Sequence, residues 1–206
     1  MPLSMPLIVL LVVMYTPTYL EFSTQTNSLF FLNNGVKLFL LRSFALFGFV
    51  FPVISILILK YSRQIDSLQL DNQRQRTVPL FLSGMYAIML FTLLMRFQSQ
   101  VSLSAHLFSL TVSGAIIAFV SLLINLRFKV SLHASGAGIL LGFMFSYYME
   151  QSLLVSWPIY MCSIVAGLII ASRIFLRKHT ISELLIGFNI GFFVTFLTDY
   201  LFVLYF

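Results

Sequence analysis

Residues 102–126, SLSAHLFSLTVSGAIIAFVSLLINL, form an unbroken stretch without Asp, Glu, Lys or Arg. A helix rises about 1.5 Å per residue, so about 20 such residues cross the roughly 30 Å hydrocarbon layer of a bilayer. Lipid cannot satisfy exposed backbone N–H and C=O groups, which restricts spanning segments to helices and closed barrels. The ten-residue alternation typical of barrel strands is not present in this sequence. The stretch therefore predicts a transmembrane helix.

Six other apolar runs have similar composition and lie at about 5–20, 38–59, 79–96, 132–149, 154–172 and 182–205. Hydrophobic residues make up 60% of the 206 residues and charged residues only 9%, against about a quarter charged in soluble domains. We predict an all-α fold, a polytopic transmembrane helical bundle with six to seven spans in one integral membrane domain, residues 1–206. The first run has a short apolar core with Pro17 near its end, so it either spans the bilayer or re-enters it.

Three polar segments interrupt these runs, at residues 60–77, 127–133 and 172–183. Two predicted spans separate each segment from the next, so all three are expected at one membrane face. Basic residues follow the same division, and an excess of them is typical of the cytoplasmic side. We therefore expect a bacterial inner membrane protein whose polar face is cytoplasmic. Nine of the twelve basic residues lie at this face (Lys60, Arg63, Arg74, Arg76, Arg127, Lys129, Arg173, Arg177 and Lys178), and Lys37, Arg42 and Arg96 lie opposite.

The net charge of +6 does not indicate a nucleic-acid partner, because the cations are scattered over short loops without a basic helix or an aromatic RNA-binding motif. A phosphate ester or lipid headgroup is the expected anion. Cys162 is the single cysteine, which excludes an intrachain disulfide. The sequence offers no convincing cluster of metal ligands, and no cofactor is expected.

The third polar segment contains a histidine and a carboxylate at helical spacing. His179 and Glu183 are four residues apart at the start of the last apolar run, so their side chains share a helix face. A carboxylate that accepts the Nδ1 proton leaves Nε2 free and stabilises the positive charge that develops when Nε2 attacks an electrophile. This spacing predicts a histidine nucleophile.

The first two polar segments supply further groups suited to phosphate. Ser131 and His133 stand at the opening of the apolar run at 132–149. There a hydroxyl and the amides at the start of a helix can bind phosphate oxygens. An imidazole at this place can protonate a leaving group. Arg74 and Arg76 precede the run at 79–96, and guanidinium groups bind phosphate with two parallel hydrogen bonds. All these residues are candidates for one site.

The pattern resembles the type 2 phosphatidic acid phosphatases, which share a site with bacterial acid phosphatases and vanadium haloperoxidases. Their third motif, Ser-Arg, five residues, His, three residues, Asp, matches Ser172, Arg173 and His179, with Glu183 in place of Asp. Their second motif, Pro-Ser-Gly-His, corresponds to VSLH at 130–133. Their first motif, Lys, six residues, Arg-Pro, aligns poorly: Arg76 is its arginine, Gln69 occupies the lysine position, and proline arrives late at position 79. The resemblance covers a phosphatase-like core of about residues 60–206.

The resemblance implies a phosphohistidine mechanism without a metal. His179 would attack phosphorus, His133 would protonate the departing alcohol, and water would hydrolyse the intermediate. Arg173, Ser131 and Arg76 would hold phosphate oxygens, with Arg74 and Ser172 as further candidates, and Glu183 would orient His179. The exchange of Asp for Glu adds a methylene, which predicts a shift of the imidazole by about one ångström relative to the family.

The leading hypothesis is a membrane lipid phosphatase that hydrolyses a phosphomonoester or diphosphate headgroup, of the phosphatidate, phosphatidylglycerol phosphate or prenyl diphosphate class. One alternative is a lipid phosphotransferase. Another is a non-catalytic family member that binds or transports a lipid phosphate or serves as a scaffold. The sequence does not specify the lipid, the membrane side that the site faces or the oligomeric state.

Three other features receive structural interpretations. Arg177 and Lys178 are expected to anchor a helix end at the membrane surface rather than to bind phosphate. His106, on the opposite face, is expected to be an interfacial hydrogen-bonding residue. Two glycine pairs, Gly138 with Gly142 and Gly187 with Gly191, have the four-residue spacing that lets transmembrane helices approach closely.

Overall fold

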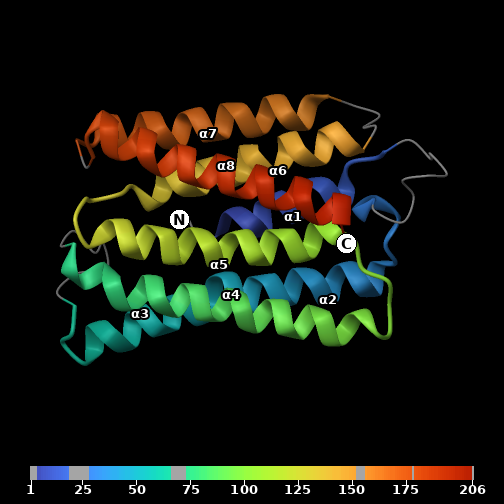
Figure 1. The fold of residues 1–206 in the computed structure, drawn as a ribbon, viewed down its shortest axis with the longest axis horizontal. Helices are drawn as coiled ribbons and strands as arrows, with labels where there is room; N and C mark the ends of the chain where they lie inside the picture. The colour runs from blue at the N-terminus through green and yellow to red at the C-terminus, as the bar shows by residue number, and fades with distance from the viewer. Residues whose placement is uncertain (1–3, 19–27, 66–72, 152–155, 178, 206) are drawn as a thin grey trace.

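The computed structural model describes residues 4–18, 28–65, 73–151, 156–177 and 179–205, and over these residues the regular elements are all helical (Figure 1). The predicted all-α polytopic bundle is confirmed, and each of the seven apolar runs corresponds to a helix or to a pair of continuous helices. The α-helices are α1 (Met5–Tyr15), α2 (Asn34–Ala45), α3 (Phe51–Tyr61), α4 (Thr77–Gln98), α5 (Ala105–Asn125), α6 (Leu132–Glu150), α7 (Trp157–Phe175) and α8 (Ile181–Tyr205).

Five stretches of the described chain are long and apolar enough to cross a membrane. They are Asn34–Tyr61, Arg74–Gln98, Ala105–Asn125, Trp157–Phe175 and Ile181–Tyr205. Helix α6 is not among them, because serines, glycines and tyrosines interrupt its apolar residues, and it packs inside the bundle against α8, α7 and α1. Helix α1 has 11 residues and reaches about 16 Å, roughly half a hydrocarbon layer, so the first predicted run is too short to span as a helix.

A local change of helix type accounts for the long span Asn34–Tyr61. Pro52 is near the start of α3 and has no N–H to donate to the preceding turn. The preceding residues Leu46–Val50 form a π-turn, in which the N–H of Phe51 donates to the carbonyl of Leu46. The chain thus passes the proline without leaving the helical path, and α2 and α3 act as one membrane segment.

The end of α1 is held by a lysine from α2. The ammonium of Lys37 donates to the carbonyl oxygen of Met14 at 2.8 Å and to that of Phe30 at 2.6 Å. A cation at a helix C-terminus satisfies carbonyl groups that have no partner within the helix. Lys37 therefore fixes the short α1 at one end of the bundle.

The three polar segments lie together at the other end of the bundle, as predicted from the count of spans. In Figure 1 the α3–α4, α5–α6 and α7–α8 connections all reach the left end, whereas the C-terminus lies at the right. Hydrogen bonds join the described parts of the segments in sequence order. The links are Gln73 Nε2 to Asn125 O, Asn125 Nδ2 to Gln73 O at 2.8 Å, Arg76 Nη1 to Val130 O at 3.0 Å, and Ser131 N to Glu183 O at 3.3 Å.

Glycines set the spacing between α6 and α8. A Cβ placed on Gly191 would lie 2.1 Å from the carbonyl oxygen of Ser135, and one on Gly138 would lie 2.3 Å from that of Phe188. Gly142 and Gly187 meet the facing backbone in the same way. The close-packing role predicted for both glycine pairs is therefore observed, and it brings the starts of α6 and α8 side by side.

Candidate active site

The start of α8 is defined by a capping interaction. Thr180 Oγ1 accepts a hydrogen bond from the backbone N–H of Glu183 at 3.3 Å, the contact that an N-cap residue makes with the third helical position. In a capping box the acidic side chain at this position turns back to the N-cap backbone. Here the carboxylate of Glu183 instead reaches His179, the residue before the cap.

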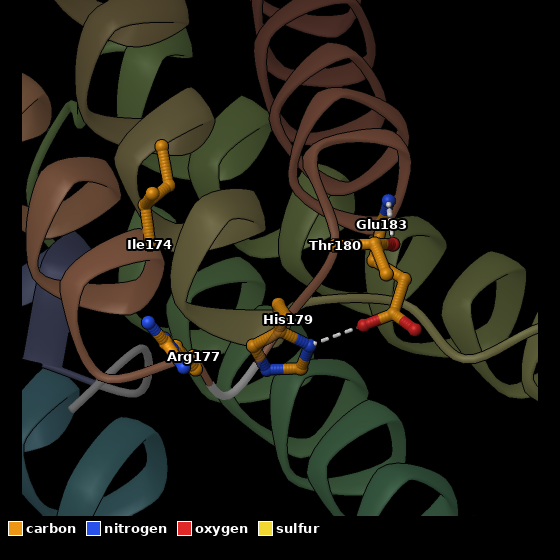
Figure 2. Close-up of a pocket in the computed structure, with 5 residues that line it drawn as sticks. All are labelled: Ile174, Arg177, His179, Thr180 and Glu183. Carbon is orange, nitrogen blue, oxygen red and sulfur yellow. Dashed lines mark hydrogen bonds and ion pairs between the residues drawn. The ribbon is translucent and has the colours of Figure 1, made fainter.

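His179 and Glu183 form the central contact of the site. His179 Nδ1 lies 2.7 Å from Glu183 Oε2, and the two side chains are 7% and 22% exposed (Figure 2). A carboxylate at this distance accepts the Nδ1 proton and selects the tautomer with a free Nε2 lone pair. The predicted contact between His179 and Glu183 is therefore observed, with Glu in place of the family Asp. The predicted reason is wrong, because His179 precedes α8 and the two residues do not share a helix face.

A pocket of about 260 Å³ opens beside this pair and is lined by Ile174, Arg177, His179, Thr180 and Glu183. Figure 2 shows Arg177 on the side of the imidazole opposite Glu183. The backbone of Arg177 has a φ of 50°, a left-handed conformation in which its N–H donates to the carbonyl of Ile174. This turn ends α7 and returns the chain toward α8. The sequence predicts Arg177 to be a membrane anchor, and in the structure Arg177 also lines this pocket.

Ser131 and His133 stand at the start of α6. Ser131 is fully buried, and its Oγ accepts the backbone N–H of Ala134 at 3.4 Å as the N-cap of the helix. The hydroxyl proton remains available for an anion. His133 follows in the first turn, outside the five spanning stretches. Burial, together with the positive charges of Arg173, His179 and Arg76, lowers the pKa of His133 from the ordinary value of 6.5 to about 4.

The same cations act on the second imidazole. Burial lowers the pKa of His179, the charges of Arg76 and Lys129 also lower it, and its contact with Glu183 opposes them. Arg76 therefore acts on both histidines, from a position that is 6% exposed and fixed by its bond to the Val130 carbonyl. Positive charge from three separate polar segments converges on the two imidazoles, as an anion site requires.

Arg173 provides a buried donor at this place. It lies in the last turn of α7, and its charge acts on His133. Its Nε is buried and has no hydrogen-bond partner among the described residues. A buried guanidinium nitrogen without a partner loses its water without compensation, so it is normally satisfied by a ligand or an ion.

Two predicted phosphate ligands are placed elsewhere. Ser172 Oγ donates to the carbonyl of Ile169 at 2.7 Å in its own helix, so its hydroxyl proton is used there. Arg74 is exposed and lines a separate pocket of about 460 Å³. Gln73, Thr77, Asn125 and Leu126 complete that lining. Gln69 and Lys178 lie outside the described residues. Among the described residues no group of three His, Cys, Asp or Glu side chains is arranged to hold a metal ion.

The candidate site thus combines an imidazole–carboxylate pair, a second imidazole and two guanidinium groups at one end of a helical bundle. A family model described as the PAP2 superfamily matches residues 125–204, which contain the second and third motifs but not Arg74 and Arg76. Residues 125–204 thus match this superfamily, and the resemblance to the type 2 phosphatidic acid phosphatases is confirmed over this part of the chain. No curated protein and no solved structure matches the chain.

Proposed function

We propose that the protein is a metal-independent lipid phosphatase in which His179 forms a covalent phosphohistidine. The observation that carries the proposal is the 2.7 Å contact between His179 Nδ1 and Glu183 Oε2. The buried Nε of Arg173, which has no partner among the described residues, supports it, because the charge of Arg173 acts on His133. In-line transfer of a phosphoryl group requires an oriented nucleophile together with cationic donors.

The first step is attack of His179 Nε2 on phosphorus. The N–P bond forms, the bond from phosphorus to the lipid alcohol oxygen breaks, and that oxygen takes a proton from His133. Arg173, Arg76 and the hydroxyl of Ser131 stabilise the charge on the equatorial oxygens. Glu183 stabilises the positive imidazole ring while the N–P bond exists.

In the second step His133 acts as a base instead of an acid. His133, now neutral, accepts a proton from water as the water oxygen attacks phosphorus, and the N–P bond breaks to release inorganic phosphate and neutral His179. The low pKa of His133 in the empty site leaves it unprotonated at neutral pH. A bound phosphate offsets the charges of Arg173 and Arg76, so substrate binding raises this pKa and prepares the acid form.

A lipid substrate is favoured by the position of the site. The pocket lies between the end of α7 and the start of α8, and both helices are candidate membrane spans. A substrate whose acyl or prenyl chain stays in the bilayer presents its headgroup at this level. We further propose that the site faces the cytoplasm of a bacterial inner membrane, in line with the nine basic residues at this face against three opposite.

The test is release of inorganic phosphate by the purified, folded protein from phosphatidate, phosphatidylglycerol phosphate and a prenyl diphosphate. The wild type should release phosphate from at least one of them and give an acid-labile phosphoenzyme. His179→Ala should lose both signals, and Arg127→Ala, a change at an exposed cation of the same face, should keep them. Lack of release from all three lipids by folded wild type would contradict the proposal, and product formed only with an added alcohol would identify a phosphotransferase.

A further inference from the structure

A second cluster of ionisable groups lies in the bundle at the end opposite the site. His106 of α5 is fully buried, and its Nδ1 lies 3.0 Å from both carboxylate oxygens of Asp199 of α8. Its Nε2 lies 3.2 Å from Glu150 Oε2 at the end of α6, and Ser109 donates to Asp199 Oδ1. His106 is thus hydrogen-bonded as expected, but it lies inside the bundle, where it joins three helices.

An aromatic residue extends this cluster toward the N-terminal part of the chain. The ring of Tyr147 lies 4.8 Å from the His106 ring, centroid to centroid, and its hydroxyl accepts the backbone N–H of Leu29 at 3.1 Å. Tyr147 is also fully buried. The cluster therefore brings α5, α6, α8 and the turn before α2 into contact.

Stability alone is a poor explanation for such a cluster. Removing an imidazole and a carboxylate from water opposes folding, and well-packed apolar residues of similar volume often stabilise a protein as much or more. Ionisable residues inside membrane bundles are rare and usually serve a function. In well-attested cases, a buried polar contact fixes the register of one helix against another.

Helices α6 and α8, which take part in this cluster, carry the candidate catalytic groups at their opposite ends. Glu183 and Asp199 are the first and last residues of one row on α8, spaced in steps of four, with Gly187, Gly191 and Thr195 between them. The 16 residues from Glu183 to Asp199 correspond to about 24 Å of helix. Neither α6 nor α8 contains a proline, so an axial shift or rotation at one end is transmitted to the other.

The contact between α6 and α8 is close, because Gly138 and Gly191 bring the two backbones together. A movement of α8 would therefore also change its placement against α6. At the site end the described cross-link between the two backbones is the 3.3 Å bond from Ser131 N to Glu183 O. At the other end, Asp199 attaches α8 to α5 through His106 and Ser109.

We propose that Asp199 and His106 are positioning residues, which hold α8 in the register that places His179 and Glu183 against His133. This inference rests on the proposed phosphatase function for its kinetic consequence, but the register itself is measurable without activity. Asp199 touches neither pocket, and its effect on the reaction would pass through the length of α8.

The first experiment measures the register directly. Spin labels at Leu123 of α5 and Leu185 of α8, both exposed near the site end, report the position of α8 by pulsed EPR in a Cys162→Ala background in nanodiscs. The parent should give one narrow distance distribution, and Asp199→Leu should shift or broaden it. Thr195→Val is the matched control, because Thr195 lies on the same row, is equally buried, and its Oγ1 has no partner among the described residues.

The second experiment measures turnover per folded molecule for the same variants without labels. A displacement of about one ångström at the reacting groups lowers the rate by about a hundredfold, so Asp199→Leu should lower kcat by tenfold to a hundredfold with a smaller change in KM. Asp199→Asn keeps a hydrogen-bond acceptor for Ser109 and should recover part of the loss. A role in stability alone would lower the yield or Tm and leave kcat and the distance unchanged.

The outcomes separate the two proposals. If Asp199→Leu does not fold, Asp199→Asn and Ser109→Ala take its place, and each should broaden the distance distribution relative to Thr195→Val. An unchanged distribution in every folded Asp199 and Ser109 variant would overturn the positioning role, whatever the activity. A shifted distribution in a wild type that releases no phosphate would retain the register role and reject the phosphatase function.

Discussion

Ser131 donates its backbone N–H to the backbone carbonyl of Glu183 with an N···O distance of 3.3 Å, and this bond joins the two motifs of the candidate site. The residue that caps α6 is thereby attached to the first turn of α8. His133 and His179, which are 46 positions apart in the sequence (179 − 133), follow and precede these two bonded residues closely.

Both the charge and the side-chain length of Glu183 should be required for full activity. Glu183→Gln removes the charge that stabilises the imidazole ring during attack, and kcat should fall by about 10²- to 10³-fold. Glu183→Asp restores the family residue but withdraws the carboxylate from its 2.7 Å contact, and kcat should fall by about tenfold or more. Phosphate release by variants that retain the wild-type Tm provides the measurement. Asn189→Ala, a change on the same helix at a side chain bonded only to its own helix, is the control. Full activity of Glu183→Asp would show that this contact does not position the nucleophile.

Arg173 should bind phosphate through its fixed guanidinium plane. Arg173→Lys keeps the charge but loses the Nε donor and the two-nitrogen geometry, so kcat/KM should fall by about 10²-fold, and Arg173→Ala should be lower still. Inorganic phosphate should protect the wild type, but neither variant, from thermal unfolding. The same-face control Arg127→Ala should keep both activity and protection. Equal protection of Arg173→Ala and the wild type would remove this residue from the site.

The acid limb of the pH profile should report His179. A protonated Nε2 cannot attack phosphorus, so activity falls as pH drops through the pKa of His179. Burial together with the charges of Arg76 and Lys129 lowers this pKa from the ordinary value of 6.5, so the limb in kcat/KM should lie on the acidic side of 6.5. Lys129→Gln removes one of the lowering charges and should move the limb to higher pH. Arg127→Gln should leave it in place, and an identical shift for both variants would indicate a general charge effect.

The sequence allowed the fold and the central pair to be predicted because both depend on local spacing. Apolar runs of about 20 residues can satisfy their backbone groups only as helices. His179 and Glu183 are close in the sequence, so they can meet across the start of α8 although His179 lies outside the helix. The common face of the three polar segments followed from counting spans. These inferences needed no knowledge of how the helices pack.

The remaining features depend on tertiary structure or on backbone conformation. Arg74 and Arg76 belong to one 3₁₀ turn, but the charge of Arg76 acts on both imidazoles, whereas Arg74 lines a separate pocket. Arg177 lines the pocket from a turn in which its φ is positive, and no local sequence pattern predicts this backbone conformation. The contact between His106 and Asp199 joins residues 93 positions apart, and only the packing of α5 against α8 brings them together.

Gly191 should not accept a side chain, whereas Gly167 should. A Cβ on Gly191 would lie 2.1 Å from the Ser135 carbonyl oxygen, and separating the two backbones should destabilise the protein by about 1–3 kcal/mol. At Gly167 of α7 nothing lies within 4 Å of an added Cβ, so Gly167→Ala should raise stability by about 0.5–1 kcal/mol through its higher helix propensity. Thermal unfolding in one detergent compares the two variants. A stable, active Gly191→Ala protein would contradict the close contact.

His133 should matter in proportion to the basicity of the leaving group. If His133 protonates the departing oxygen, His133→Asn should lower the rate of phosphoenzyme formation by about 10²- to 10⁴-fold with an alkyl phosphate, whose alkoxide needs a proton. With p-nitrophenyl phosphate, whose leaving group is stable as an anion, the same substitution should have a much smaller effect on this step. Single-turnover measurement of phosphoenzyme formation isolates the step from the later attack of water, in which His133 acts as base. Equal losses with both substrates would assign His133 to phosphate binding, because a group that only holds the equatorial oxygens does not distinguish one leaving group from another.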